Sequence, residues 1–352
     1  MRVMIPLSVL DLAPVPDGLD VGDALRASLS LARHVEGLGY RRFWMAEHHS
    51  MPGIASAATA VALAHVAAGT STIRVGAGGI MLPNHSPLQV AEQFGTLAAL
   101  HPGRIDLGLG RAPGTDQAAA RAMRRNLHRD PDSFPRDVVE LLGYFGPPEI
   151  AAPVRAIPGE GLDVPVWILG SSIFGAELAA QLGLPYAFAS HFAPQMMMPA
   201  IALYRQKFRP SRWLDAPYVM LGFNAFVADS DEQAELLATS LYQAFVNLST
   251  GRAGKLPRPM VGYLDTLSME GRLMLEQTLS SSAIGSPATV RARIEQFVER
   301  TGADELMVTS QIHDHAARLR SYGLLADAVD LTHSAPPEPF DGAQDRLVEG
   351  LS

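Results

Sequence analysis

The chain has 352 residues, of which 47% are hydrophobic and 18% are charged, and its formal net charge is −8. This composition provides a large core and excludes a disordered chain, and the negative charge without any basic block argues against nucleic-acid binding. The chain contains no cysteine, which excludes disulfides, thiolate catalysis and Cys-ligated zinc or iron–sulfur sites.

The N-terminus leads directly into a strand-like run and lacks the pattern of a signal peptide. The longest stretch of low polarity, residues 54–69, contains Ser56, Thr59 and His65 and is too short to span a bilayer. We therefore expect a cytoplasmic protein without membrane association.

Short apolar runs alternate with helical patterns along most of the chain. Asp20 is placed to cap the first helix, and Ser86-Pro87-Leu88-Gln89 and Ser230-Asp231-Glu232-Gln233 match the capping-box pattern. Predicted strands cover residues 3–10, 42–46, 72–82, 105–110, 164–169, 186–190, 218–228 and 304–310. Predicted helices cover residues 21–38, 57–68, 87–100, 118–129, 134–145, 174–182, 198–208, 231–248, 287–301 and 313–329.

Two regions depart from this alternation. Residues 249–282 show no clean period and are rich in glycine and proline at their start, which predicts an insertion or a mobile lid. Residues 333–352 contain three prolines and are expected to form a mobile tail. Residues 1–332 are expected to form a single domain.

Eight strands that are each followed by a helix predict a (β/α)8 TIM barrel. The alternative, an open doubly wound sheet, lacks its usual fingerprint, because no G-x-G-x-x-G pattern opens a helix. In a barrel, functional residues lie at the C-terminal ends of the strands. Residues at these ends are Glu47, His48, His49, Gly78, Gly79, Asn84, His85, Arg111, Ser171, Ser172, Ser190 and His191.

The end of the fourth strand indicates an anion site. Gly108 and Gly110 leave room for a flat ligand against the backbone, and Arg111 offers five donors suited to a phosphate. Ser171 and Ser172 precede a helix on the next strand, where free amides and the helix dipole favour an anion. Taken singly, Arg111 could be solvated and the serines a plain N-cap, but their position on successive strands favours a phosphate site.

His48 and His49 are interpreted as residues on opposite faces of the second strand, so that one serves proton transfer and the other packing. Metal binding is disfavoured, because no H-x-H or H-E-x-x-H spacing is present. Gly78-Gly79 is either a bulge where a planar ring meets the backbone or a site of tight helix packing.

Several spaced runs resemble the bacterial-luciferase-like flavin monooxygenase family. They are Ala46-Glu47-His48-His49, the run from Val75 to His85, the run from Gly103 to Gly114, and Leu169-Gly170-Ser171-Ser172. The resemblance implies a (β/α)8 barrel with FMN across its C-terminal mouth.

The resemblance also implies roles for individual residues. Arg111, Ser172 and the amides near Ser171 and Gly175 would hold the phosphate, and His48 would be the active-site histidine. A non-proline cis peptide at Gly78-Gly79 would lie under the isoalloxazine. Gly110 and Ser190 complete the expected cofactor contacts.

The predicted function is a monooxygenase that uses reduced FMN and dioxygen on a small organic substrate. A deazaflavin-dependent oxidoreductase and a non-catalytic flavin-binding protein stay open as alternatives. Luciferase carries glutamate at the position of Ser171 and cysteine at that of Gly110, which argues against light emission. No second dinucleotide site is evident, since Arg121, Arg124, Arg125 and Arg129 read as a solvated helix face, so we expect a separate NAD(P)H-flavin reductase as partner. A homodimer is left open.

Overall fold

The structure is a computed structural model, and the statements below concern the part of the chain that it describes. This part comprises residues 5–112, 119, 122–123, 133–148, 152–331, 338 and 340. The predicted helix at 118–129 and its four arginines lie almost entirely outside this part.

Eight parallel strands close into a barrel, which confirms the predicted fold and overturns the open-sheet alternative. The pairings run from β1 through β7 in chain order, and β9 joins β7 to β1 and thereby closes the ring. β8 pairs with the C-terminal half of β7 outside this ring. The strands are β1 (Leu7–Asp11), β2 (Arg42–Met45), β3 (Arg74–Met81), β4 (Ile105–Gly110), β5 (Val166–Gly170), β6 (Tyr186–Phe188), β7 (Val219–Val227), β8 (Ser282–Gly285) and β9 (Glu305–Thr309).

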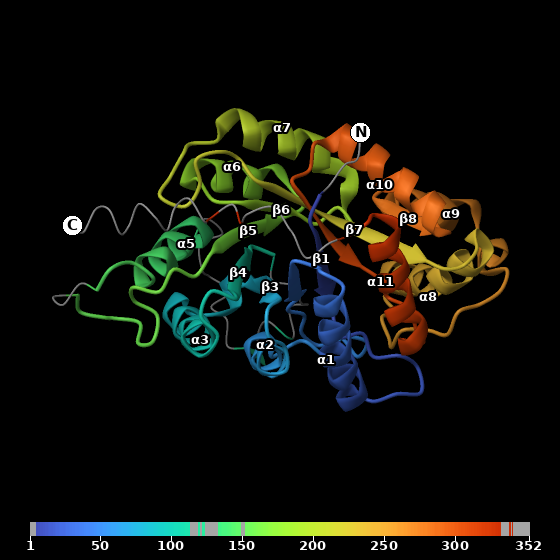
Figure 1. The fold of residues 1–352 in the computed structure, drawn as a ribbon, viewed down its shortest axis with the longest axis horizontal. Coiled ribbons are helices and arrows are strands. Elements are labelled where there is room, and N and C mark those ends of the chain that lie inside the picture. The colour runs from blue at the N-terminus through green and yellow to red at the C-terminus, as the bar shows by residue number, and fades with distance from the viewer. Residues whose placement is uncertain are drawn as a thin grey trace.

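Helices surround the barrel, with α1, α2 and α3 along one side and α6, α7 and α10 along the other (Figure 1). Asp20 and Asp23 form the capping box of α1, and Ser230 caps α8. The capping box predicted at Ser86 is wrong, because its hydroxyl makes no cap bond. The helices are α1 (Val21–Gly37), α2 (Thr59–Ala68), α3 (Pro87–Leu100), α5 (Ser133–Tyr144), α6 (Ile173–Leu182), α7 (Met197–Lys207), α8 (Asp231–Ser249), α9 (Met269–Thr278), α10 (Pro287–Thr301) and α11 (His315–Ala328).

The barrel interior is filled by large apolar side chains rather than open as a pore. Trp44 from β2 and Trp167 from β5 meet edge to face with ring centroids 5.2 Å apart. Met220 and Met307 pack in the same buried cluster. Since this packing blocks the axis, a ligand can enter only from an end of the barrel.

The N-terminal end of the barrel is closed by charged side chains and by two residues of the tail, Glu338 and Phe340. Arg42 is fully buried and contacts carboxylates of Asp106, Glu305 and Glu338. Phe340 packs edge to face on Trp167, with ring centroids 5.8 Å apart. These two tail residues therefore lie against the barrel, in contrast to the expected mobile tail, and most of residues 333–352 falls outside the described part.

The region predicted as an insertion or lid has regular structure that the sequence analysis missed. It contains the 3-10 turn η3 (Tyr263–Thr266), helix α9 and the start of β8. Its first part crosses to the loop after β1, where the amide of Leu256 donates to the carbonyl of Val15 at 2.8 Å. The insertion therefore lies at the C-terminal end of the barrel, where a lid would be useful, and its opening and closing stay a prediction.

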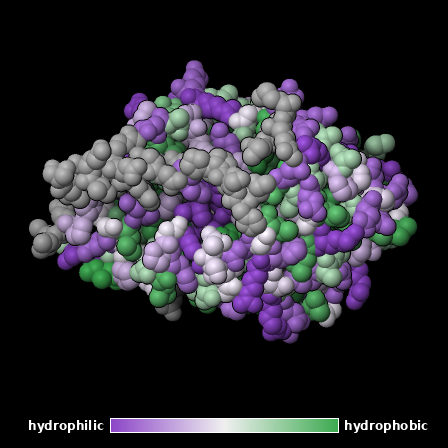
Figure 2. Space-filling model, viewed as in Figure 1, coloured by the Kyte–Doolittle hydropathy of each residue, from purple (hydrophilic) through white to green (hydrophobic). Residues whose placement is uncertain are grey.

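On the face shown in Figure 2, hydrophobic residues are scattered among hydrophilic ones, as is usual for surfaces of folded proteins. None of the helices in the described part of the chain is both long enough and apolar enough to cross a membrane.

Candidate active site

A small apolar cavity opens inside the C-terminal half of the barrel. Its volume is about 40 Å³, and its wall includes Leu10, Trp44 and Met220 from three strands and Gly78 and His191. Pockets for drug-sized ligands measure roughly 300–1,000 Å³, so this cavity by itself is too small to enclose such a ligand.

Gly78 and Gly79 form a bulge at the rim of this cavity. The peptide bond between them is cis, as the resemblance implied, and the register between β3 and β4 shifts between Ala77 and Ile80. A Cβ atom on Gly79 would lie 2.7 Å from the carbonyl oxygen of Gly108, and one on Gly78 would lie 2.8 Å from Leu10. The glycines thus permit close approach of strands, which excludes the alternative of tight helix packing.

The end of β4 and the start of α6 form a corner suited to an anion. Gly110 pairs with Leu169, so Arg111 follows β4 beside the turn that leads into α6. The guanidinium of Arg111 stacks over the ring of Phe174 in the first turn of α6, 4.1 Å from its centroid. Ser172 is the N-cap residue, and its hydroxyl makes no cap bond. The first-turn amides and this hydroxyl are therefore available to a ligand.

Gly175 and Ser190 have structural roles in the same wall. Gly175 is buried, and a Cβ atom on it would lie 3.4 Å from the ring of Tyr186. Ser190 is completely buried, and its hydroxyl donates to the carbonyl of Gly222 at 2.7 Å. This hydrogen bond uses the only proton of the hydroxyl, so a further contact of this hydroxyl would have to be as an acceptor, and the expected cofactor contact of Ser190 stays a prediction.

His48 lies at the rim near a second histidine that the sequence analysis did not select for catalysis. Burial and the neighbouring His48 lower the pKa of His191 to about 4, so His191 is neutral at pH 7. Its buried Nδ1 has no hydrogen-bond partner among the described residues. The imidazole of His191 thus has a ring nitrogen beside the cavity that donates or accepts according to its tautomer.

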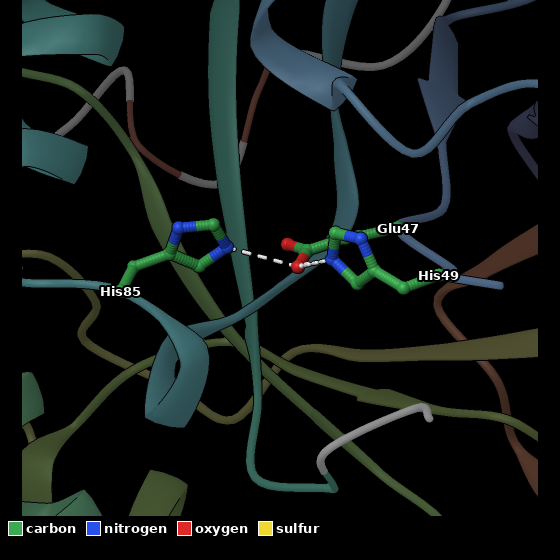
Figure 3. A group of neighbouring side chains, drawn as sticks. All are labelled: Glu47, His49 and His85. Carbon is green, nitrogen blue, oxygen red and sulfur yellow. Dashed lines mark hydrogen bonds and ion pairs between the residues drawn. The ribbon is translucent and has the colours of Figure 1, made fainter. Parts of the chain in front are cut away.

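Glu47 is the centre of a polar cluster that the sequence analysis also missed (Figure 3). Its Oε1 accepts hydrogen bonds from Nε2 of His49 at 2.6 Å and of His85 at 2.9 Å. Its Oε2 accepts the amide of Met81 at 2.9 Å. Burial alone would raise the pKa of Glu47, but these hydrogen bonds and the charge of His85 outweigh burial and hold the pKa below its ordinary value.

The argument that predicted a packing role for His49 is wrong, because it placed His48 and His49 on opposite faces of a strand. β2 ends at Met45, so the alternation of side chains across a strand does not extend to His48 and His49. The His49 side chain is 21% exposed and pairs with Glu47.

Glu47, His49 and His85 also resemble a metal-ligand set, because their ligand atoms lie within 4.8 Å of one another. Ligands of a tetrahedral zinc ion lie about 2.0–2.1 Å from the metal and hence roughly 3.3 Å apart. The separations of 2.6 and 2.9 Å are those of hydrogen bonds. We therefore interpret the cluster as hydrogen-bonded.

Sequence comparisons place this chain close to one group of proteins. A family model described as luciferase-like monooxygenase matches residues 5–305. A luciferase-like monooxygenase of Escherichia coli (strain K12) is 52% identical over 323 residues, which is 92% of this chain and 96% of the relative. The N-acetyl-S-alkylcysteine monooxygenase of Bacillus subtilis (strain 168) is 30% identical over 337 residues, which is 93% of this chain and 98% of the relative.

Solved structures agree with these matches. The crystal structure of apo-MsnO8 is 38% identical, with a TM-score of 0.88 over 94% of this chain and 99% of that one. The oxygenating constituent of 3,6-diketocamphane monooxygenase from Pseudomonas putida, in complex with FMN, is 18% identical with a TM-score of 0.68 over 95% and 99%. An F420-dependent secondary alcohol dehydrogenase is 13% identical with a TM-score of 0.64 over 93% and 99%. The last two show a shared fold alone.

Proposed function

The chain belongs to the luciferase-like monooxygenase family, and from this premise we propose that it is a flavin-dependent monooxygenase that acts on a small organic substrate with dioxygen and reduced FMN. The observation that carries this proposal is the anion corner of Arg111 and α6 beside the Gly78-Gly79 bulge. A nucleotide-like cofactor needs this combination, because its phosphate and its flat ring must be held at neighbouring places.

The anion corner fits a single terminal phosphate. Arg111 would supply charged donors, and the Ser172 hydroxyl with the first amides of α6 would supply neutral ones. Stacking on Phe174 restricts the guanidinium before any ligand arrives, which reduces the entropy lost on binding.

The rim fits a flat ring. Gly78, Gly79 and Gly110 expose backbone without side chains, and at Gly110 the nearest atom to an added Cβ would be 3.8 Å away. Reduced flavin, when bound, would supply the electrons that activate dioxygen. His48 would accept or donate a proton near the ring, and the insertion would limit the access of water from the side of β1.

FMN is proposed over a deazaflavin, although neighbours of the same fold contain either FMN or F420. The enzyme from Bacillus subtilis, which is 30% identical, is named a monooxygenase, and the relative from Escherichia coli carries the same designation. A flavin-dependent monooxygenase requires a flavin whose reduced form reacts with oxygen, and FMN meets this requirement. Tight binding of F420 without binding of FMN would instead favour hydride transfer.

Replacing Arg111 with alanine is expected to weaken FMN binding about tenfold to a hundredfold, because a hydrogen bond to a charged group contributes about 1.5–3 kcal/mol. Fluorescence titration of FMN measures this change. The matched control is Arg212→Ala, which also removes an exposed arginine stacked on an aromatic ring, here Trp213 at 4.5 Å. Equal FMN affinity in both variants would remove Arg111 from the site.

The proposed reaction can be tested with the purified protein and reduced FMN. We expect rapid reoxidation on mixing with oxygen, with a transient flavin absorbance that differs from both the reduced and the oxidised forms. Binding of FMN without such a transient or any turnover in a substrate screen would support a flavin-binding protein instead.

The protein is also expected not to reduce FMN efficiently from NADH or NADPH, since a dinucleotide needs a second phosphate site. Anaerobic mixing of protein, FMN and NADPH should leave the flavin absorbance nearly unchanged until a flavin reductase is added. Rapid bleaching without a reductase would make the protein self-sufficient and remove the need for a partner.

A further inference from the structure

Glu47 ties together two parts of the candidate site that come from different elements. It lies two residues after the end of β2, whereas Met81 ends β3 and His85 lies just beyond the 3-10 turn η1 (Leu82–Asn84). The Glu47 side chain is only 1% exposed, so its charge depends on the donors around it.

The first connection is to the bulge. The amide of Glu47 donates to the carbonyl of Gly79 at 3.4 Å, and Oε2 of Glu47 accepts the amide of Met81 at 2.9 Å. The first bond is made at Gly79, inside the segment from Ala77 to Ile80 in which β3 and β4 change register, and the second at Met81, just after this segment. Glu47 therefore holds the backbone on which a ring would rest.

The second connection sets the protonation pattern of two imidazoles. A carboxylate only accepts hydrogen bonds, so the nitrogens of His49 and His85 that face Oε1 of Glu47 must carry hydrogen. When either ring is neutral, the hydrogen on Nε2 leaves its Nδ1 as an acceptor. Both rings are partly exposed, with 21% and 29% of their side-chain surface accessible.

We propose that Glu47 is a positioning residue of the active site, which fixes the strand next to the Gly78-Gly79 bulge by accepting the amide of Met81 with one carboxylate oxygen and holds His49 and His85 as Nε2–H tautomers with the other. This inference rests on the proposed function only where it concerns flavin. The effect on the histidines is a property of the flavin-free protein.

The variant Glu47→Gln separates the two connections. Its amide oxygen can still accept from Met81, whereas its NH2 group would face the histidines and donate rather than accept. We expect the Nε2 resonances of His49 and His85 to move from the protonated to the unprotonated range in 15N spectra of histidine-labelled, flavin-free protein. The variants His49→Gln and His85→Gln assign the two signals.

The flavin arm uses both Glu47→Gln and Glu47→Ala. We expect FMN affinity to stay within about threefold of the wild type for glutamine and to fall about tenfold or more for alanine, equivalent to about 1.4 kcal/mol. Glu36→Gln is the matched control, because Glu36 also accepts backbone amides, from Ser71, Thr72 and Ile73, but before the start of β3 at the opposite end of the barrel.

The two measurements test the two roles of Glu47 separately. Unchanged histidine signals in Glu47→Gln overturn the tautomer role, and wild-type FMN affinity in folded Glu47→Ala overturns the bulge role. If Glu47→Ala does not fold, the histidine spectra of the glutamine variant still decide. A wild-type protein that binds no FMN refutes the proposed cofactor and leaves the spectra intact. Titration with Co²⁺ that produces a saturable visible band, lost in His85→Gln, would overturn the proposal by showing a metal site.

Discussion

Turnover of the His48→Ala variant is expected to fall about 100- to 10,000-fold, the range that a positioned general acid or base contributes. His48 lies near His191, which lines the cavity beside the Gly78-Gly79 bulge, so its imidazole is within the region where a ring and substrate would meet. Thermal stability should change little, because the side chain is half-buried and not part of the core.

The control for His48 is His65→Ala on α2, which removes an exposed imidazole far from the cavity and should leave turnover unchanged. Turnover is measured with reduced FMN supplied by a reductase and with the substrate that the oxygen-consumption screen identifies. If His48→Ala retains wild-type turnover while His191→Ala loses it, proton transfer belongs to His191.

The free energy of unfolding of Arg42→Ala is expected to be about 3–5 kcal/mol below that of the wild type. The Arg42 side chain has no exposed surface, and its guanidinium lies 2.8 Å from Glu305 and 3.0 Å from Asp106. Removal of the guanidinium takes from Glu305 its nearest charged partner and leaves Asp106 with Arg74 alone, and weakened pairing of a buried charge is far more costly than an unmade surface contact. Urea unfolding followed by circular dichroism measures the change.

Arg26→Ala is the control for Arg42, since its ion pair with Asp23 is exposed and should contribute at most about 1 kcal/mol.

The pH dependence of the free energy of unfolding gives a second measure of the Arg42 ion pairs. Burial would raise the pKa of Asp106, but Arg74 and Arg42 outweigh it and hold the pKa below its ordinary value. The stabilisation is therefore complete above the unfolded pKa of about 3.9 and is lost as the pH falls toward the folded pKa.

In Arg42→Ala the acid side of this profile should shift upward, because Asp106 keeps only Arg74 as a charged partner. A variant with the wild-type free energy of unfolding and an unchanged midpoint of acid unfolding would show that the ion pairs of Arg42 do not stabilise the fold.

The corner of Arg111 and Ser172 was predictable because its parts are local. A strand that ends in Gly108-Leu109-Gly110-Arg111 and a Gly170-Ser171-Ser172 turn before a helix each carry their meaning within a few residues. The barrel rule then places both at the same rim, and the pairing of Gly110 with Leu169 bears this out.

The cluster around Glu47 was not predictable in the same way. His85 lies 38 residues from Glu47, and no spacing rule relates the two. The one usable signal was that Glu47, His49, Asn84 and His85 follow the neighbouring strands β2 and β3, whose C-terminal ends lie together. This signal places the four residues at one rim but does not say which of them pair.

By itself the sequence determined the eight-stranded barrel and the place of Arg111 and Ser172 at one rim of it, since hydrophobic period, caps and turns act over short distances. Only the tertiary structure decided that the Ser190 hydroxyl donates to the carbonyl of Gly222, that His49 pairs with Glu47, and that Arg42 pairs with Glu338 at the N-terminal end of the barrel. α9 and β8 likewise form where they pack on α8 and β7, without a clear pattern of their own. Hydrogen bonds and ion pairs between distant residues depend on which strands become neighbours, and no local pattern records that outcome.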